Sequence, residues 1–470
     1  MRPADSLASI GAGTVRGTER DGTTAFLGLP YGAPPCGADR WRAPRPVAPW
    51  TGVRDATQLG PAPPQPDRPV AGCFFGELGR QDEDCLALNV WSPGCDGRRP
   101  VVMWVHGGGL TIGAAGAEIF GGARLSRALD AVVITVGYRL GSLGWLHHPA
   151  LADGPGAPSG NWGLQDLVAA LRWVHEEAAA FGGDPQRVIA AGESAGAAAV
   201  LHLLGAPGAE GRLHGAIAMS PPLGESTHPA ALGTAWAEAL AAALGAGDVP
   251  GLRPVPAPAV VAAHERLLGR PPFAGTRGGA QAVIEPATLP ADPLDTPSAS
   301  LAVRVLIGTN ADEATFFFRQ PGRVLDPDPE TLARLVARQP GVTDAEAVLR
   351  RARATAGTDD ANELLVRIAT EAIFDGPVDR WAQARAAAGG HVHRYRLAHR
   401  SPQPGLGAVH SIGVPLLFGS HGTRTGAWLT GDGTAARDAA AALQLSFAAW
   451  VHGRDPGWPL LPAGGTHVFP

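Results

Sequence analysis

The sequence contains no lysine, so all 38 of its basic residues are arginines. Three kinds of chemistry need a lysine: a phosphate-binding Walker A loop, a Schiff base with a carbonyl substrate, and a serine–lysine hydrolase pair. The sequence excludes all three. It also lacks a long basic block and has a formal net charge of −5. Both features argue against nucleic acid as a partner.

Long apolar runs and metal-binding cysteine pairs are missing as well. No stretch of about 18 uninterrupted apolar residues occurs, so we expect no membrane span. The N-terminus, MRPADSLASI, shows no signal-peptide pattern, and none of the four cysteines has Cys-x-x-Cys spacing. We therefore expect a cytoplasmic protein with reduced thiols. If the protein is instead exported, Cys73 and Cys85 could close a small loop.

Apolar residues make up 45% of the 470 positions, enough for a substantial core. This length suggests two domains, but large α/β enzymes extend further as one unit, and we expect a single domain over residues 1–470. Short apolar runs bounded by turn residues alternate with helical patterns, which predicts an α/β fold with a large, mostly parallel sheet flanked by helices. The strand candidates are 100–109, 130–139, 187–194, 214–220, 303–310 and 391–397. Two helical regions, roughly 221–290 and 314–390, are interpreted as insertions over the active site.

The segment Gly192-Glu193-Ser194-Ala195-Gly196 joins a predicted strand to a predicted helix. A strand, Gly-x-Ser-x-Gly and a helix form a nucleophile elbow, in which a tight turn exposes the serine at a helix N-terminus that favours negative charge. A chance match is conceivable in a chain with 64 glycines, but Ser194 is the only serine that fits. Glu193 has a simpler alternative role, since a carboxylate in the first turn of a helix is favourable by itself.

The loop His106-Gly107-Gly108-Gly109 follows another predicted strand. Acyl transfer through a serine creates an oxyanion, and glycines let backbone N–H groups approach it without side chains in the way. The loop fits the oxyanion loop of esterases and lipases. The alternative is a plain flexible turn.

A nucleophilic serine needs a base and an orienting acid, which follow it in the order acid, then histidine. Asp312 and Glu313 lie at a strand end, where sheet enzymes carry active-site groups. Asp292 and Asp295 are rival acids in a proline-rich loop. Among the histidines that follow, we favour His410, because its small neighbours leave room for the imidazole to reach the serine. The candidates are His391, His393, His399, His410, His421, His452 and His467.

These motifs, and nearly the whole chain, resemble the type-B carboxylesterase family of the α/β-hydrolase fold, which includes bacterial para-nitrobenzyl esterases and the cholinesterases. Segments in the family's order include QDEDCLALNVW at 81–91, VVMWVHGGGL at 101–110, VLIGTNADEATFFF at 305–318 and GAVHSIGVPLLFG at 407–419. The resemblance implies ester hydrolysis through an acyl-serine, with no metal or organic cofactor. It also implies roles for seven residues: nucleophile Ser194, acid Glu313, base His410, oxyanion donors Gly108, Gly109 and Ala195, and Glu193 as a residue that tunes the site.

Three positions depart from the family pattern. Gly413 stands where a glutamate commonly follows the histidine by three residues, which puts the nearby carboxylate network in doubt. Ser220, expected to support the site by a hydrogen bond, is followed by Pro221 rather than glycine. The loop between Cys73 and Cys85 lacks the tryptophan with which cholinesterases hold a quaternary ammonium, so we do not expect choline esters as substrates.

The expected partner is a small-molecule ester, with no nucleic acid and no membrane, and the chain is expected to be a monomer or homodimer. The same triad could hydrolyse carbamates, amides or lactones, or transfer an acyl group to an alcohol. A non-catalytic binding module is a further alternative. The run Phe316-Phe317-Phe318 is expected to pack in the core rather than line the site.

Overall fold

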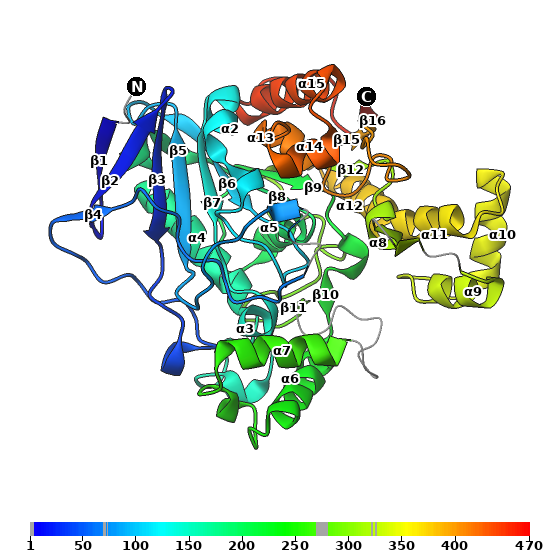
Figure 1. The fold of residues 1–470 in the computed structure, drawn as a ribbon, viewed down its shortest axis with the longest axis horizontal. Coiled ribbons are helices and arrows are strands. Elements are labelled where there is room, and N and C mark those ends of the chain that lie inside the picture. The colour runs from blue at the N-terminus through cyan, green and yellow to red at the C-terminus, as the bar shows by residue number, and fades with distance from the viewer. Residues whose placement is uncertain (1–3, 69–71, 73, 269–280, 321–322, 325–326) are drawn as a thin grey trace.

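The computed structural model describes residues 4–68, 72, 74–268, 281–320, 323–324 and 327–470. Its main feature is a 12-stranded sheet that runs through the molecule from the N-terminal strands to the C-terminal strand (Figure 1). Its strands are β1 (Ala4–Ile10), β2 (Gly13–Arg20), β3 (Thr23–Pro30), β4 (Val53–Asp55), β5 (Ala87–Ser92), β6 (Arg99–Val105), β7 (Val132–Val136), β8 (Gly183–Glu193), β9 (Gly215–Met219), β12 (Arg304–Asn310), β15 (Val392–Leu397) and β16 (Thr466–Phe469).

The spatial order is β1-β2-β3-β5-β7-β6-β8-β9-β12-β15-β16, with β4 beside β2. All pairs from β7 to β16 are parallel, whereas β1, β2, β3, β5 and β7 pair antiparallel. The predicted, mostly parallel sheet is confirmed. The antiparallel N-terminal strands were not predicted, because segments such as GTVRGTER are half polar and carry no continuous apolar run.

The central strands are buried on both faces. All five residues of β7 are buried; Val132, Ile134 and Val136 belong to one core cluster and Val133 to the other. Since successive side chains of a strand point to opposite faces, a strand between two helical layers must be apolar throughout. This is why a strand such as β7 was visible in the sequence as an uninterrupted apolar run.

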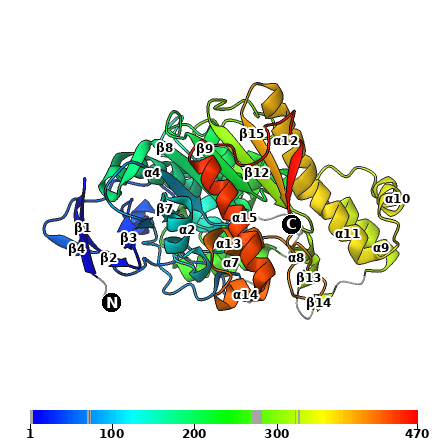
Figure 2. The same ribbon diagram turned by 90° about the horizontal axis from the view of Figure 1, so that it is seen from above.

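Helices cover both faces, as Figure 2 shows. The core on one face contains residues of α4 (Trp162–Glu177), α5 (Ala195–Gly205) and α12 (Gly376–Ala387). The core on the other face contains residues of α2 (Gly122–Leu129), α13 (Gly413–Phe418), α14 (Arg424–Thr430) and α15 (Thr434–Val451). The short helix α3 (Gly141–Trp145) precedes α4.

Two groups of helices extend beyond the sheet (Figure 1). The first is the pair α6 (Ala230–Leu244) and α7 (Ala257–Leu268), which has its own apolar cluster around Trp236 and Val260. The second comprises α8 (Thr315–Phe318), α9 (Pro329–Ala337), α10 (Ala345–Ala356) and α11 (Ala361–Thr370). A π-helical turn, η7 (Glu371–Asp375), joins α11 to α12. Both groups lie within the predicted insertions.

Within the described ranges, every helix is too short or too polar to cross a lipid bilayer. Cys36, Cys85 and Cys95 are free thiols, and Cys85 is buried. Cys73 lies outside the described residues.

Candidate active site

Ser194 occupies a strained turn between β8 and α5. Its φ of 57° and ψ of −129° are unusual for a residue with a side chain, and such a conformation costs about 1–3 kcal/mol. The turn is fixed by a hydrogen bond from the Ser194 N–H to the Met219 carbonyl, 2.9 Å long. A Cβ on Gly192 would lie 2.6 Å from the Gly196 backbone, and one on Gly196 would lie 2.2 Å from the Val105 carbonyl oxygen. The two glycines of the motif are therefore required by close packing around the serine.

His410 links Ser194 to Glu313. Its Nε2 lies 2.8 Å from the Ser194 Oγ, and its Nδ1 lies 2.6 Å from a Glu313 carboxylate oxygen. All three side chains are buried, and the relative exposure of Ser194 is 8%. Because the carboxylate accepts the Nδ1–H, the neutral imidazole presents the Nε2 lone pair to the serine hydroxyl. The three residues come from the end of β8, the end of β12 and the loop before α13.

The Glu313 carboxylate is held on both oxygens. One oxygen accepts the Asn310 backbone N–H at 2.6 Å, and the other accepts from His410. The Asn310 side-chain amide in turn donates to the Val409 carbonyl, 3.1 Å away. Asn310 thus ties the acid loop to the histidine loop, which fixes the direction in which the imidazole points.

The rival acids lie elsewhere. Asp312 has other partners: it accepts the Ala408 backbone N–H at 2.8 Å and lies 3.6 Å from Arg400. Asp292 accepts a hydrogen bond from Thr227 in the first insertion. Among these acid candidates, Glu313 is therefore the one that contacts the imidazole, although Asp312 is its neighbour in the sequence.

Among the alternative histidines, four make other contacts, and His393 accepts the Trp450 indole N–H at 3.3 Å. His399 and His452 contact the carbonyls of Thr430 and Leu129, and the ring of His467 stacks on Trp458. None of these four contacts involves Ser194.

The glycine loop after β6 lies beside Ser194. Gly108 and Gly109 have φ values of 105° and 63°, and both line the cavity that contains Ser194. The Gly108 carbonyl accepts hydrogen bonds from the backbone N–H groups of Thr111 and Ile112. A Cβ on Gly108 would lie 2.1 Å from the Ile112 carbonyl oxygen, so a side chain does not fit. No described residue accepts a hydrogen bond from the N–H groups of Gly108, Gly109 or Ala195.

His106 holds the glycine loop in place through contacts of its buried ring. Its ring is buried, stacks on Tyr138 at 4.5 Å between centroids, and contacts the Gly107 carbonyl through Nδ1 at 2.9 Å. Burial lowers the pKa of His106 to about 4, so the ring is neutral at pH 7. The Tyr138 hydroxyl donates to the His106 carbonyl at 2.7 Å. These contacts hold the loop rigid.

Glu193 places a second carboxylate beside the imidazole. Its Oε1 lies 3.3 Å from the His410 Nε2 and accepts a hydrogen bond from the Ser411 hydroxyl at 2.7 Å. Burial raises the pKa of Glu193, and this rise is opposed by the nearby His410 and by the Ser411 hydrogen bond. Ser411 could not be found from the sequence, because one serine beside a histidine carries no pattern of its own.

The cavity at Ser194 has a volume of about 370 Å³ and mostly apolar walls. Phe316 and Phe317 belong to these walls, and their ring centroids lie 6.1 and 5.6 Å from that of His410. Both rings pack against apolar clusters, as expected, but the expectation that they would not line the site was wrong, because helix α8 turns them toward His410. Phe318 packs in the apolar clusters of the second insertion, as expected. The other apolar wall residues are Phe74, Phe75, Ile112, Ile119, Phe120, Leu268 and Val414.

Two of the three sequence departures, Gly413 and the Ser220–Pro221 pair, lie next to the site. Gly413 begins α13, and a Cβ there would lie 2.9 Å from the Met219 side chain and 3.2 Å from that of Leu397. A larger side chain would therefore require its neighbours to shift. Ser220 is buried, has a φ of 51°, and donates its backbone N–H to the Gly308 carbonyl at 2.7 Å. This bond joins the ends of β9 and β12 next to the site.

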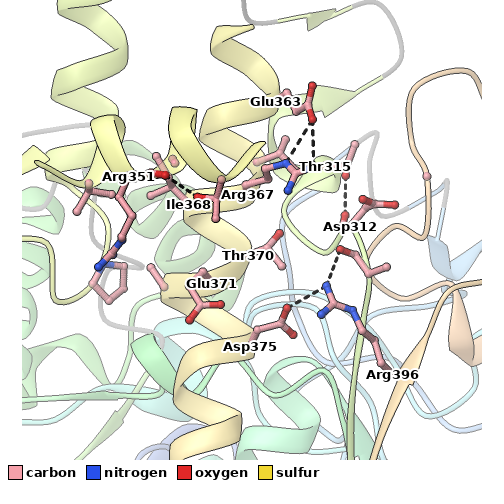
Figure 3. Close-up of a pocket in the computed structure, with 18 of the residues that line it drawn as sticks. Asp312, Thr315, Arg351, Glu363, Arg367, Ile368, Thr370, Glu371, Asp375 and Arg396 are labelled. Carbon is pink, nitrogen blue, oxygen red and sulfur yellow. Dashed lines mark hydrogen bonds and ion pairs between the residues drawn. The ribbon is translucent and has the colours of Figure 1, made fainter. Parts of the chain in front are cut away.

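A second, larger cavity of about 970 Å³ is lined in part by Ala311, Asp312 and Thr315, which flank Glu313 in the sequence (Figure 3). Thr315 lines it, whereas the next two residues line the Ser194 cavity. Its walls are polar and largely paired: Arg396 lies 3.2 Å from Asp375, and Arg367 lies 3.2 Å from Glu363. It contains no residue of the Ser194–His410–Glu313 chain.

Comparison with known proteins gives consistent results. The model of the carboxylesterase family matches residues 4–448. A phenmedipham hydrolase of Pseudarthrobacter oxydans is 34% identical over 478 residues, covering 98% of this chain and 94% of the relative. A para-nitrobenzyl esterase of Bacillus subtilis (strain 168) is 33% identical over 412 residues, covering 87% and 82%. A solved PNB esterase structure matches with a TM-score of 0.87 and 29% identity, covering 99% of this chain and 96% of the other.

A large, mostly parallel sheet with helices on both faces and a serine turn after a central strand defines an α/β-hydrolase. The chain belongs to the carboxylesterase family, and it is a serine hydrolase of carboxylic esters. The fold class, family and enzyme class predicted from the sequence are confirmed.

Proposed function

We propose that Ser194, His410 and Glu313 are the catalytic triad with which this chain hydrolyses small-molecule esters. The observation that carries the proposal is the continuous contact from the Ser194 Oγ through both ring nitrogens of His410 to Glu313, with distances of 2.8 and 2.6 Å. Nucleophile, base and orienting acid need this connection.

In the first half of the reaction, the Ser194 oxygen attacks the ester carbonyl carbon while the His410 Nε2 removes its proton. The carbonyl π electrons move to the oxygen and form an oxyanion. The buried Glu313 carboxylate stabilises the imidazolium through the Nδ1–H. When the tetrahedral intermediate collapses, Nε2–H protonates the leaving alcohol, and the acyl group remains on Ser194.

In the second half, His410 takes a proton from water, whose oxygen attacks the acyl carbonyl. The acid leaves, and Nε2–H returns a proton to the Ser194 oxygen. The oxyanions of both halves are assigned to the backbone N–H groups of Gly108, Gly109 and Ala195. Two observations support this assignment: no described residue accepts hydrogen bonds from these groups, and Ala195 begins helix α5, whose positive dipole end favours negative charge.

The cavity supports neutral esters with apolar groups as the substrate class. Its volume of about 370 Å³ lies at the lower end of small-molecule sites, and phenylalanine and branched aliphatic side chains dominate its walls. Glu193 and Glu313 place negative charge beside the reacting centre, which disfavours a substrate whose anionic group lies near the scissile bond.

We further propose that residues 1–470 form one domain that acts as a monomer or homodimer in the cytoplasm. One sheet holds strands from both ends of the chain, which supports a single domain. The buried free thiol of Cys85 supports a reducing compartment.

A series of p-nitrophenyl esters of increasing acyl length tests the proposal. The wild-type chain should release nitrophenol and prefer the acyl lengths that the cavity holds, and Ser194→Ala should lose turnover. Added alcohol separates hydrolysis from acyl transfer: release of free acid supports hydrolysis, whereas a new ester as the main product contradicts it. Turnover in Ser194→Ala equal to that of the wild type overturns the proposed nucleophile.

A further inference from the structure

Ser411 and His410 contact the same oxygen atom of Glu193. The Ser411 hydroxyl donates to Oε1 at 2.7 Å, and the His410 Nε2 lies 3.3 Å from this oxygen. Nε2 also lies 2.8 Å from the Ser194 Oγ. Two oxygens, one from Glu193 and one from Ser194, therefore compete for the nitrogen that must move a proton.

In the resting enzyme, this geometry brings two hydrogen-bond acceptors, the His410 Nε2 and the Glu193 Oε1, close together. Nε2 carries a lone pair, directed to the Ser194 hydroxyl, because Nδ1–H is directed to Glu313, and the Glu193 Oε1 lies 3.3 Å from the same nitrogen. Two acceptors at this distance repel each other unless another donor offsets the negative charge. The Ser411 hydroxyl is such a donor, and it binds the facing oxygen itself.

After His410 has taken the serine proton, the Glu193 carboxylate has a different effect on Nε2. The imidazolium Nε2–H now needs to point to the leaving alcohol, but a free carboxylate oxygen would draw it away. Because Ser411 already donates to Oε1, this oxygen attracts Nε2–H less strongly. Glu193 can then stabilise the positive ring while the proton remains available to the reacting oxygen.

We propose that Ser411 is a positioning residue that acts through Glu193 and directs the proton on His410 toward the reacting oxygen. The proposal rests on the proposed triad. Ser411 reaches this position because its φ of 66° turns the chain immediately after His410. The other side of Glu193 is packed against the oxyanion loop, since a Cβ on Gly107 would lie 2.8 Å from Oε2.

The charged and titratable groups that surround Glu193 determine in which direction the loss of the Ser411 hydroxyl shifts the pKa of the Glu193–His410 cluster. His410 lowers the pKa of Glu193 and Glu313 raises it. Tyr395, a buried phenol whose own pKa is raised by burial, also interacts electrostatically with Glu193. The Ser411 hydrogen bond favours the deprotonated cluster, because Oε1 is shared with Nε2–H once a proton has been taken up. Removing the hydroxyl should therefore make the cluster bind its proton at higher pH.

The variant for the test is Ser411→Gly, because glycine accepts the left-handed backbone without strain. The acid limb of the kcat/KM profile should move up by about one pH unit, a tenfold change in the protonation equilibrium. In a Glu193→Gln background the same change should cause no further shift, because the charge through which Ser411 acts is gone. Ser300→Gly is the matched control: Ser300 also has a positive φ, 48°, but lies before β12 at the end remote from the site. Its pH profile should equal that of the wild type.

An upward shift in the wild-type background that disappears with Glu193→Gln supports the proposal. The same shift in both backgrounds, or no shift in either, overturns it while leaving the triad intact. Turnover in Ser194→Ala would instead defeat the proposed triad, so the two failures are distinguishable. An unchanged melting temperature for Ser411→Gly confirms that its altered profile does not come from unfolding.

Discussion

The Nε2 atom of His410 lies 2.8 Å from the Oγ of Ser194, although 216 positions separate the two residues. The fold explains the meeting. Ser194 follows the carboxyl end of β8, and Glu313 follows that of β12, two strands further along the sheet. His410 lies in the loop after β15, the strand beside β12. Parallel strands bring their carboxyl ends to one edge, where active-site loops collect.

Replacing Glu313 should reduce kcat far more than replacing its sequence neighbour Asp312. Glu313→Gln removes the charge that stabilises the imidazolium and disturbs the Nδ1–H tautomer, so kcat should fall by about 10³–10⁴-fold. Asp312→Asn is the matched control, because its side-chain oxygen can still accept the Ala408 N–H. It should retain most of the wild-type kcat in a p-nitrophenyl ester assay. Equal losses in the two variants would contradict the assignment of Glu313.

A side chain on the oxyanion loop should damage the reaction more than the fold. Gly108→Ala places a Cβ against the Ile112 carbonyl oxygen and displaces the N–H groups, so kcat should fall by about 10²–10³-fold. Gly457→Ala controls for backbone strain, since Gly457 has a φ of 109° and no heavy atom near its missing Cβ. Steady-state kinetics measures both variants. A comparable kcat loss in Gly457→Ala would mean that strain alone explains the effect.

The aromatic wall should set the acyl preference. Phe316→Ala removes a ring that packs edge-on against Phe74 at 4.5 Å in the cavity wall, so longer acyl chains should become better substrates. Phe318→Ala, two residues away, removes a ring packed in the second insertion. It should lower the melting temperature without changing the order of preference. An unchanged preference in Phe316→Ala would exclude this wall from substrate recognition.

Buried neutral histidines should make the fold sensitive to acid. Burial lowers the pKa of His106, His202 and His264 to about 4. Their unfolded pKa is about 6.5, so between pH 6.5 and 4 the unfolded chain binds more protons than the folded one. Stability is therefore full above pH 6.5 and falls as the pH drops, by about 1.4 kcal/mol per pH unit for each histidine.

His202→Leu tests this stability effect away from the active site. Within the described residues both ring nitrogens of His202 lack hydrogen-bond partners, so leucine should be tolerated at pH 7. Urea unfolding at pH 7 and pH 5 should show that the free energy of unfolding falls less in the variant than in the wild type. The difference should correspond to about one proton fewer taken up on unfolding. An identical pH slope in the two proteins would show that His202 is not buried in its neutral form.

The sequence predicted the central sheet well because its strands are buried on both faces. Strands such as β6 and β7 are apolar runs, although β15 mixes apolar and charged residues, and the glycine and serine motifs lie at the ends of apolar runs. The N-terminal strands escaped prediction for the opposite reason. β2, for example, alternates buried and partly exposed residues in its first six positions, and its partly or fully exposed arginines and glutamate resemble a surface loop.

In the candidate site, too, some residues could be predicted from local sequence patterns and others could not. Ser194 and the glycine loop have local patterns, since tight turns and close approaches restrict which residues fit. By spacing alone, Asp312 and Glu313 were equivalent, and the resemblance to the family decided between them. Their separation depends on the direction of two side chains after β12, which no local pattern encodes. Ser411 and the inward-facing Phe316 are also products of tertiary packing.

The most direct test of the central claim is to locate the covalent bond formed with an organophosphate probe. We expect one adduct per chain, found by mass spectrometry on the peptide that contains Ser194, with a loss of esterase activity in proportion to labelling. Ser194→Ala should give no adduct. Labelling of Ser194→Ala at the same stoichiometry, or an inactivating adduct on another residue, would contradict the account.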